Sequence, residues 1–216
     1  MTDEHRLIEE SRIKKHSGLI QLYTGNGKGK TTSSVGLVTR ALSYDWKVLV
    51  VQFLKTNCHA YSFLEKMSDK ITVKQFGRPK ITLPTNADQT DREIVGEAWN
   101  FIHTEFEKNE YDMIVLDEVL PALNMFLFLK TELYDFMKQC RERKTELVLT
   151  GRMWSSELKA KIVARADLVS DVTVVKHYFS KSCSNCNRSF EDYSYTNCPY
   201  CGTELKSVPA RQGIEW

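Results

Sequence analysis

The chain has 216 residues, with 30 Lys and Arg against 28 Asp and Glu, so its formal net charge is only +2 at pH 7. This balance provides no general electrostatic attraction to nucleic acid or to an acidic membrane surface, and we do not expect either partner. No apolar run approaches the roughly 18 residues of a membrane-spanning helix, and residues 1–15 (MTDEHRLIEESRIKK) are charged rather than signal-like. We therefore expect a cytoplasmic protein with one α/β domain and a small appendage.

A stretch rich in glycine and lysine near the N-terminus predicts a bound nucleotide. The stretch is 25-GNGKGKTT-32, and it follows the apolar run 18-GLIQLY-23 and precedes a helix-like segment. Glycines let backbone N–H groups turn toward an anion, Lys30 can reach phosphate oxygens, and the hydroxyl of Thr31 can reach Mg²⁺. The pattern therefore predicts a P-loop that holds a nucleoside triphosphate.

The loop departs from the usual P-loop pattern at one position. That pattern has a glycine five residues before Gly29, whereas this chain has Thr24 there. A variant loop can hold its nucleotide in a changed pose. The loop alone therefore does not tell which reaction the nucleotide serves.

Hydrophobic patterning predicts that strands alternate with helices along most of the chain. The predicted strands are 18–23, 47–53, 71–76, 112–118, 146–151 and 172–178. The predicted helices are 30–43, about 58–67, a long helix from residue 90, about 131–143 and about 155–165, with a weakly patterned helix at 4–16. Residues 77–87 contain two prolines and no clear period, so we predict a loop there. This alternation predicts an α/β fold: a P-loop NTPase-like, mostly parallel sheet with helices on both faces.

Several side chains in these elements are interpreted as structural. Thr90 and Glu93 form a capping-box pattern at the start of the long helix. Trp99 lies on the apolar face of that helix and is predicted to be in the core. Cys140 shares the apolar face of the 131–143 helix, and both Cys58 and Cys140 are interpreted as ordinary thiols.

Four predicted strand ends are expected to form one site, because ligands of open parallel sheets bind beyond the carboxyl ends of the strands. These ends are the P-loop, residues 52–55, the pair Asp117 and Glu118, and residues 151–152. Asp117 or Glu118 would hold Mg²⁺ directly or through water. His177, at the end of the last predicted strand, is either a hydrogen-bonded structural residue or a catalyst, and the sequence leaves both readings open.

The C-terminal cysteines have the spacing of a metal site. Cys183-x₂-Cys186 is followed after eleven residues by Cys198-x₂-Cys201 and then a glycine. Each CxxC turn lets two thiolates face one tetrahedral ion, and the chain has no secretion signal that would favour disulfides. The spacing predicts a small zinc-ribbon insertion with a closed, structural Zn²⁺ site. An iron–sulfur cluster is the alternative.

Taken together, the motifs resemble those of the P-loop type of ATP:corrinoid adenosyltransferases. The resemblance rests on 24-TGNGKGKTT-32, 50-VVQFLK-55, 114-IVLDE-118, 149-LTGR-152, 166-ADLVSDVTVVKHYF-179 and 210-ARQGIEW-216. It runs in order from about residue 18 to the end of the chain and is interrupted by the cysteine-rich segment. The combination of these motifs is specific, although no single one is.

The resemblance implies a reaction in which the P-loop stabilises a leaving group. A Co(I) corrinoid attacks the 5′ carbon of ATP and the whole triphosphate departs, in cobalamin synthesis or salvage. Lys30, Thr31 and Glu118 are then the expected catalytic residues, with Thr31, Asp117 and Glu118 at Mg²⁺. The expected nucleotide-binding residues are Gly25, Asn26, Gly27, Lys28, Gly29, Lys30, Thr31, Thr32, Arg40 and Arg152.

The resemblance also implies a domain order and partners. We expect an N-terminal helical segment or lid at 1–17, a P-loop domain at 18–179, the zinc-ribbon insertion at 180–206, and a tail at 207–216 that returns to the P-loop domain. The expected partners are ATP, a corrinoid, a second copy of the chain in a homodimer, and an electron donor such as a flavodoxin or ferredoxin.

The chain departs from the family pattern in the predicted corrinoid loop and in its cysteine-rich segment, which shorter members lack, and two rival functions are left open. Family members commonly show Gly-Phe-Thr-Trp at the lower face of the corrinoid, where this chain has 76-FGRPKITLP-84, so its corrinoid contacts are left open. One rival is a type II thymidine-kinase-like enzyme, which also joins a P-loop domain to a zinc knuckle. The other is a nucleic-acid-dependent ATPase, whose basic footprint is missing here.

Overall fold

A computed structural model describes residues 18–56, 59–80, 82–174, 181–186, 188–190 and 196–205. The chain divides into two compact units between Val172 and Thr173. The predicted N-terminal segment, the C-terminal tail and His177 lie outside the described residues. Within the described residues, no helix has the length and apolar character needed to cross a membrane.

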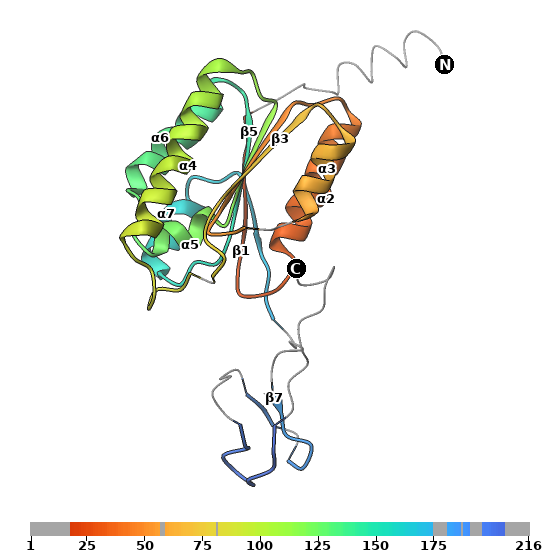
Figure 1. The fold of residues 1–216 in the computed structure, drawn as a ribbon, viewed down its shortest axis with the longest axis vertical. Coiled ribbons are helices and arrows are strands. Elements are labelled where there is room, and N and C mark those ends of the chain that lie inside the picture. The colour runs from red at the N-terminus through yellow and green to blue at the C-terminus, as the bar shows by residue number, and fades with distance from the viewer. Residues whose placement is uncertain are drawn as a thin grey trace, which may run out of the picture. The chain divides into compact units, whose positions relative to one another are not determined.

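The first unit is built on a six-stranded parallel sheet with the strand order β3-β2-β4-β5-β1-β6 (Figure 1). The strands are β1 Ile20–Thr24, β2 Val48–Phe53, β3 Ile71–Phe76, β4 Met113–Asp117, β5 Glu146–Thr150 and β6 Leu168–Asp171. All six run in the same direction, so their carboxyl ends lie along one edge of the sheet. The predicted parallel α/β fold is confirmed.

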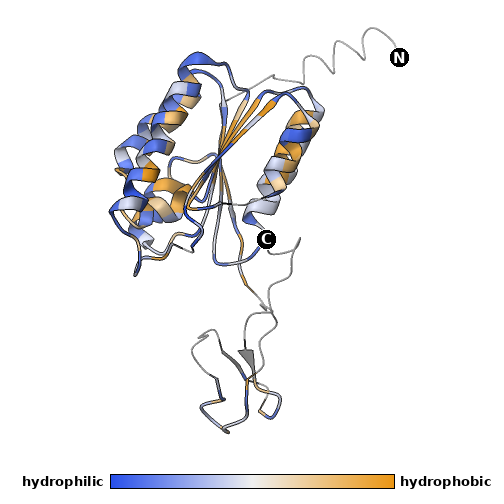
Figure 2. Cartoon of the chain, in the orientation of Figure 1, coloured by the Kyte–Doolittle hydropathy of each residue, from blue (hydrophilic) through white to orange (hydrophobic). Residues whose placement is uncertain are grey.

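Helices cover both faces of the sheet, as Figure 1 shows. On one face lie α2 Lys30–Ser43 and α3 His59–Met67, and on the other lie α4 Gln89–Lys108, α5 Val119–Asn124, α6 Lys130–Glu142 and α7 Ser156–Val163. The central strands β2, β4 and β5 are therefore buried along their whole length, which explains their continuous apolar runs. Figure 2 shows this as a hydrophobic band through the sheet.

Alternate residues of β2 point to opposite faces of the sheet and pack in two different hydrophobic cores. Leu49 and Val51 of β2 pack in the core beneath α4 to α7, whereas Val48 and Val50 pack beneath α2 and α3. Trp99 of α4 is central in the larger core, with its ring 5.1 Å from Phe128 between centroids. The predictions that Trp99 and Cys140 are core residues are confirmed, because both are buried.

Two sequence-based predictions about elements are wrong in part. Helix α5 was not predicted, because it is short and carries Pro121. The last strand runs over Leu168–Asp171 rather than starting at residue 172, and Val172 to Val174 do not extend it. The hydrogen bonds decide this: residues 168–171 pair with 21–24 of β1, after which the carbonyl of Val172 accepts from the N–H of Gly27 instead. The rest of the predicted strand, 175–178, lies outside the described residues.

The capping box of α4 lies two residues earlier than predicted. Asp88 is the N-cap, and its side chain and that of Asp91 each accept the other residue's backbone N–H at 3.1 Å. Arg78 then bridges the two carboxylates, with Nη2 2.6 Å from Asp91 Oδ2 and 2.7 Å from Asp88 Oδ2. Thr90 and Glu93 match the capping pattern in sequence, but the arginine favours the aspartate pair. This network fixes the loop between β3 and α4 to the start of α4.

The second unit is small. Its strands β7 Lys181–Ser182 and β8 Ser189–Phe190 form an antiparallel pair, and Asn197 and Glu204 form an isolated antiparallel bridge. Cys183 and Cys186 lie in the turn between β7 and β8, and Cys198 and Cys201 lie in the turn between Asn197 and Glu204.

We predict that Asp91→Asn lowers the free energy of unfolding by about 1–2 kcal/mol, because it removes the negative charge that pairs with Arg78 and one of the two side-chain oxygens that accept hydrogen bonds in this network. Hydrogen bonds from Arg78 and from the backbone outweigh the burial of Asp91 and hold its pKa below the usual range. Its stabilising effect is therefore present above pH 4 and is lost as the pH falls further (the usual pKa is 3.8). Urea unfolding at pH 7 and at pH 3 checks this. The exposed Glu97→Gln on the same helix is the control, and equal effects of both changes at pH 7 would contradict the prediction.

Candidate active site

The P-loop connects β1 to α2 and lies against the chain directly after the edge strand β6. Gly25 has a φ of 99°, and a Cβ on it would lie 2.3 Å from the carbonyl oxygen of Val172. The N–H of Gly27 donates to that same oxygen at 2.7 Å. Glycine at residue 25 is therefore required both by the backbone conformation and by the close approach of the chain after β6.

The start of α2 presents a positive end to the loop. Gly29 is the N-cap with a φ of 120°, and it has no side chain that could accept from the first backbone N–H groups of the helix. Such a helix end attracts anions. The ammonium of Lys30 folds back over the loop and donates to the carbonyl oxygen of Gly27 at 2.5 Å. Burial lowers the pKa of Lys30, and nearby Arg152 and Lys55 act in the same direction, whereas Glu118 opposes them.

Asp117, at the carboxyl end of β4, is fully buried and is the most heavily bonded side chain of the site. Its Oδ1 accepts from the hydroxyls of Thr31 at 3.0 Å and Thr150 at 2.6 Å. Its Oδ2 accepts from Gln52 Nε2 at 2.9 Å and Lys55 Nζ at 2.8 Å. Burial alone would raise the pKa of Asp117, but Lys55 and these hydrogen bonds outweigh it and hold the pKa below its usual range. Asp117 is therefore a fixed carboxylate.

Glu118 follows in a left-handed backbone conformation, with φ 60° and ψ 24°, which is uncommon for a residue with a side chain. Its N–H donates to Thr150 Oγ1 at 3.0 Å, and this bond holds the turn. Gly151 leaves room for it: a Cβ there would lie 2.2 Å from Pro121 Cδ and 3.3 Å from Glu118 Oε2. Burial raises the pKa of Glu118, while Lys55 and Lys30 lower it.

The residues predicted to hold Mg²⁺ fit a hard cation. Thr31, Asp117 and Glu118 offer only oxygen ligands, which Mg²⁺ prefers. A positive group already lies among them, because Lys55 Nζ is 2.8 Å from Asp117 and 3.5 Å from Glu118. The site therefore accommodates a cation. Residues 52–55 were expected at this edge, but no role was predicted for Lys55, although a lysine two residues after a buried strand is a usable signal.

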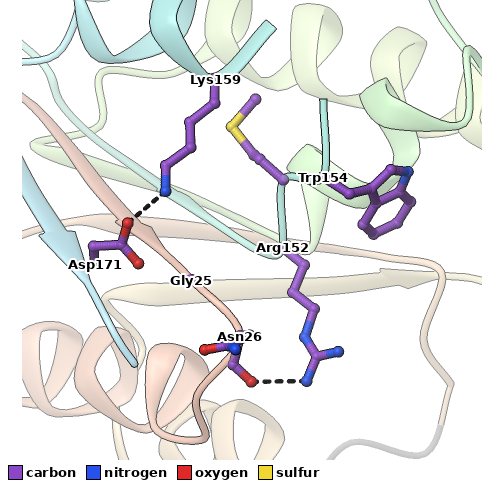
Figure 3. A pocket seen from close by; sticks show the side chains of 7 residues that line it. Gly25, Asn26, Arg152, Trp154, Lys159 and Asp171 are labelled. Atoms are coloured by element: carbon purple, nitrogen blue, oxygen red, sulfur yellow. Dashed lines mark hydrogen bonds and ion pairs between the residues drawn. The ribbon is translucent and has the colours of Figure 1, made fainter. Parts of the chain in front are cut away.

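A cleft of about 360 Å³ lies beside the P-loop, and Figure 3 shows the side chains that line it. The cleft is lined by Gly25, Asn26, Arg152, Met153, Trp154, Lys159 and Asp171. Arg152 Nη2 donates to the carbonyl oxygen of Asn26 at 2.7 Å, so the β5 end is bonded to the loop. Arg152 was predicted from the sequence, whereas Trp154, Lys159 and Asp171 were not, because only the fold brings the start of α7 and the end of β6 to the loop.

One predicted nucleotide contact lies apart from the others. Arg40 is in the last turn of α2 and is exposed. It follows Lys30 by ten residues of helix, which corresponds to roughly 15 Å along the axis. Lys28 and Thr32 are exposed beside the loop itself. The structure therefore brings together all of the predicted phosphate-site residues except Arg40.

The four cysteines of the second unit also converge. The sulfur atoms of Cys183, Cys186, Cys198 and Cys201 all lie within 4.8 Å of one another. Cys183 Sγ is 3.3 Å from Cys201 Sγ, and Cys186 Sγ is 3.6 Å from Cys198 Sγ. Sulfurs about 2.3 Å from a tetrahedral zinc lie roughly 3.8 Å apart, so the cluster has the size of a zinc site. Backbone bonds from Cys183 N–H to Arg188 O and from Cys198 N–H to Thr203 O shape the two turns.

Comparison with known proteins agrees with these features. A relative named "Corrinoid adenosyltransferase" from Pseudomonas aeruginosa is 30% identical over 172 residues, which cover 78% of this chain and 81% of the relative. Another of that name from Escherichia coli K12 is 29% identical over 192 residues, covering 83% of this chain and 94% of the relative. "Corrinoid adenosyltransferase CobA" from Salmonella typhimurium is 29% identical over 171 residues, covering 78% and 83%.

The family comparison covers most of the chain. The family described as "ATP:corrinoid adenosyltransferase BtuR/CobO/CobP" matches residues 16–188, which include the P-loop, the acidic end of β4 and the first CxxC turn. The match includes every strand of the parallel sheet. The chain therefore belongs to the ATP:corrinoid adenosyltransferase family.

Proposed function

We propose that the protein transfers the 5′-deoxyadenosyl group of ATP to the cobalt of a Co(I) corrinoid and releases triphosphate. The observation that carries the proposal is a P-loop joined to the acidic end of β4, through the hydrogen bond from Thr31 to Asp117, in a chain of this family. The comparisons give no support to a nucleoside kinase or a nucleic-acid-dependent ATPase.

In this reaction the protein has to stabilise the triphosphate as the leaving group. An electron pair of Co(I) forms the bond to C5′, the C5′–O bond breaks, and its electrons go to the triphosphate oxygen. No side chain has to remove a proton. Lys30 and the N-terminal end of α2 lie where they can bind this triphosphate, and positive groups aimed at developing charge are worth several kcal/mol in such sites.

The remaining polar residues divide between ion and nucleotide. Thr31, Asp117 and Glu118 would hold Mg²⁺, which supplies further positive charge to the triphosphate when bound. Asn26, Lys28, Thr32 and the backbone of the three loop glycines would bind phosphate oxygens. Arg152, bonded to the loop carbonyl of Asn26, would bind the nucleotide from the β5 side.

Three further assignments are part of the proposal. Because Arg40 lies in the last turn of α2, it would contact only a part of the nucleotide that extends beyond the first turns of that helix. The N-terminal segment 1–17 would act as a lid, and the active enzyme would be a homodimer. A flavodoxin or ferredoxin would donate the electron that reduces the cobalt of the corrinoid to Co(I). Residues 180–206 would form the zinc-ribbon insertion, with 207–216 returning to the P-loop domain.

The product of turnover tests the reaction. With Mg·ATP and chemically reduced cobalamin, we expect the corrinoid spectrum to change to that of the adenosylated form, with one intact triphosphate released for each corrinoid. Phosphorus NMR of the products checks this. Stoichiometric ADP and orthophosphate, or thymidine-dependent ATP use, would assign a different reaction class.

Lys30→Ala should lower kcat by about 100-fold or more, because the ammonium that donates to the P-loop carbonyl of Gly27 is lost from the leaving triphosphate. Single-turnover measurement of adenosylcobalamin formation checks this. Lys66→Ala, at an exposed residue in the last turn of α3, is the matched control and should behave like the unchanged protein. A kcat within threefold of the control would refute the role of Lys30.

Metal analysis should find about one zinc per chain, held by the four cysteine sulfurs that lie within 4.8 Å of one another. Cys198→Ser should lose the metal and destabilise the second unit, because metal binding supplies much of the folding free energy of so small a unit. ATP binding should survive. An iron absorption band would replace zinc with a cluster, and a metal-free protein with unchanged melting would remove the metal site altogether.

A further inference from the structure

We infer that Lys55 is an internal counter-cation of the candidate metal site, and that Mg²⁺ binding requires its ammonium to leave Asp117. The inference rests on the proposed Mg²⁺ site and extends it to a residue that no comparison assigns. It makes Lys55 a positioning residue that links metal binding to nucleotide binding.

The ammonium lies among the same oxygens that would hold the metal. Lys55 Nζ is 2.8 Å from Asp117 Oδ2, 3.5 Å from Glu118 Oε1 and 3.2 Å from Thr31 Oγ1. Mg²⁺ needs its ligands at about 2.0–2.1 Å in near-octahedral geometry. A divalent ion and an ammonium at this spot would repel each other strongly, so the two cannot occupy it together.

The hydrogen bonds of Asp117 indicate which donor gives way. Its two oxygens offer about four lone-pair sites, and four donors already use them. Gln52 and Thr150 are fully buried and cannot move without disturbing the sheet. Thr31 can keep donating to Asp117 while a lone pair of its oxygen faces the ion. Lys55, whose side chain is about one quarter exposed, is the donor that can turn away.

The backbone holds Lys55 at this place while its side chain stays adaptable. Leu54 has a φ of 58°, which turns the chain sharply at the end of β2. A Cβ on Gly77 would lie 2.4 Å from the backbone nitrogen of Lys55, so the end of β3 presses directly against this turn. The four-carbon stem of the lysine can then swing its ammonium from the carboxylates to an anion beside them.

This exchange has a consequence for binding order. Without a nucleotide, Lys55 neutralises one charge of the Asp117 and Glu118 pair, so a divalent ion alone gains little by binding. When the ion arrives with a triphosphate, the displaced ammonium gains phosphate oxygens as new partners. Lys55 therefore favours the metal–nucleotide complex over the bare metal and adds a third cation, beside Lys30 and Arg152, near the leaving group.

The test uses Mn²⁺ as the probe and electron paramagnetic resonance of the full-length protein as the readout. Without nucleotide, Lys55→Met should bind Mn²⁺ about tenfold more tightly than the unchanged protein, because the competing charge is gone. Lys55→Gln serves as a second neutral variant if the first folds poorly, and Lys55→Arg, which keeps the charge, should bind Mn²⁺ weakly. ATP should strengthen Mn²⁺ binding less in the neutral variants than in the unchanged protein.

Two controls separate this inference from the proposed function. Lys70→Met removes another lysine paired with a carboxylate, Asp45 at 3.3 Å, and should leave Mn²⁺ affinity unchanged. Asp117→Asn should abolish the tight Mn²⁺ binding of Lys55→Met, which would locate the ion whether or not adenosyl transfer is ever observed. Unchanged or weaker Mn²⁺ binding in the neutral Lys55 variants would overturn the inference. Mn²⁺ binding that does not depend on Asp117 would overturn both the inference and the proposed metal site.

Discussion

The buried carboxylate of Asp117 is the interaction on which the site depends. A fully buried charge is costly unless donors surround it, and here the donors come from separate elements: Thr31 from α2, Gln52 and Lys55 from the end of β2, and Thr150 from β5. The hydrogen bonds that compensate this one carboxylate thus hold the first turn of the P-loop helix against β2 and β5, the two strands that flank β4. The hydrogen bonds that compensate the charge of Asp117 are thus the same bonds that bring the elements of the site together.

The sheet makes that arrangement available. Because all six strands are parallel, the ends of β1, β2, β4 and β5 lie on one edge, and the loops that follow them can share one ligand. Close approaches sharpen the geometry: Gly25 lets the chain after β6 lie against the P-loop, and Gly151 lets Pro121 and Glu118 lie against the end of β5. Gly25 and Gly151 therefore matter in this site because a side chain on either would collide with the neighbouring backbone or proline, and not because they make the chain flexible.

Much of this was predictable from local patterns. The P-loop, the acidic end of β4 and the two CxxC turns are encoded in short stretches, and the buried strands are encoded in continuous apolar runs such as 48–53. The predictions were wrong where contacts with residues elsewhere in the chain determine the local structure. Arg78 selects Asp88 and Asp91 over Thr90 and Glu93 as the capping pair, and pairing with β1 selects 168–171 over the more strongly β-branched residues that follow.

The sequence by itself determined the parallel α/β class, the phosphate loop, the cysteine cluster and the family to which the chain belongs, because each depends on residue types at fixed spacing. Only the tertiary structure decided that Lys55 lies between Asp117 and Glu118, and that Trp154, Lys159 and Asp171 line a cleft with the P-loop. The physical reason is that these relations join residues from separate elements across the edge of the sheet. Strand order sets them, and it is not written in the neighbouring residues.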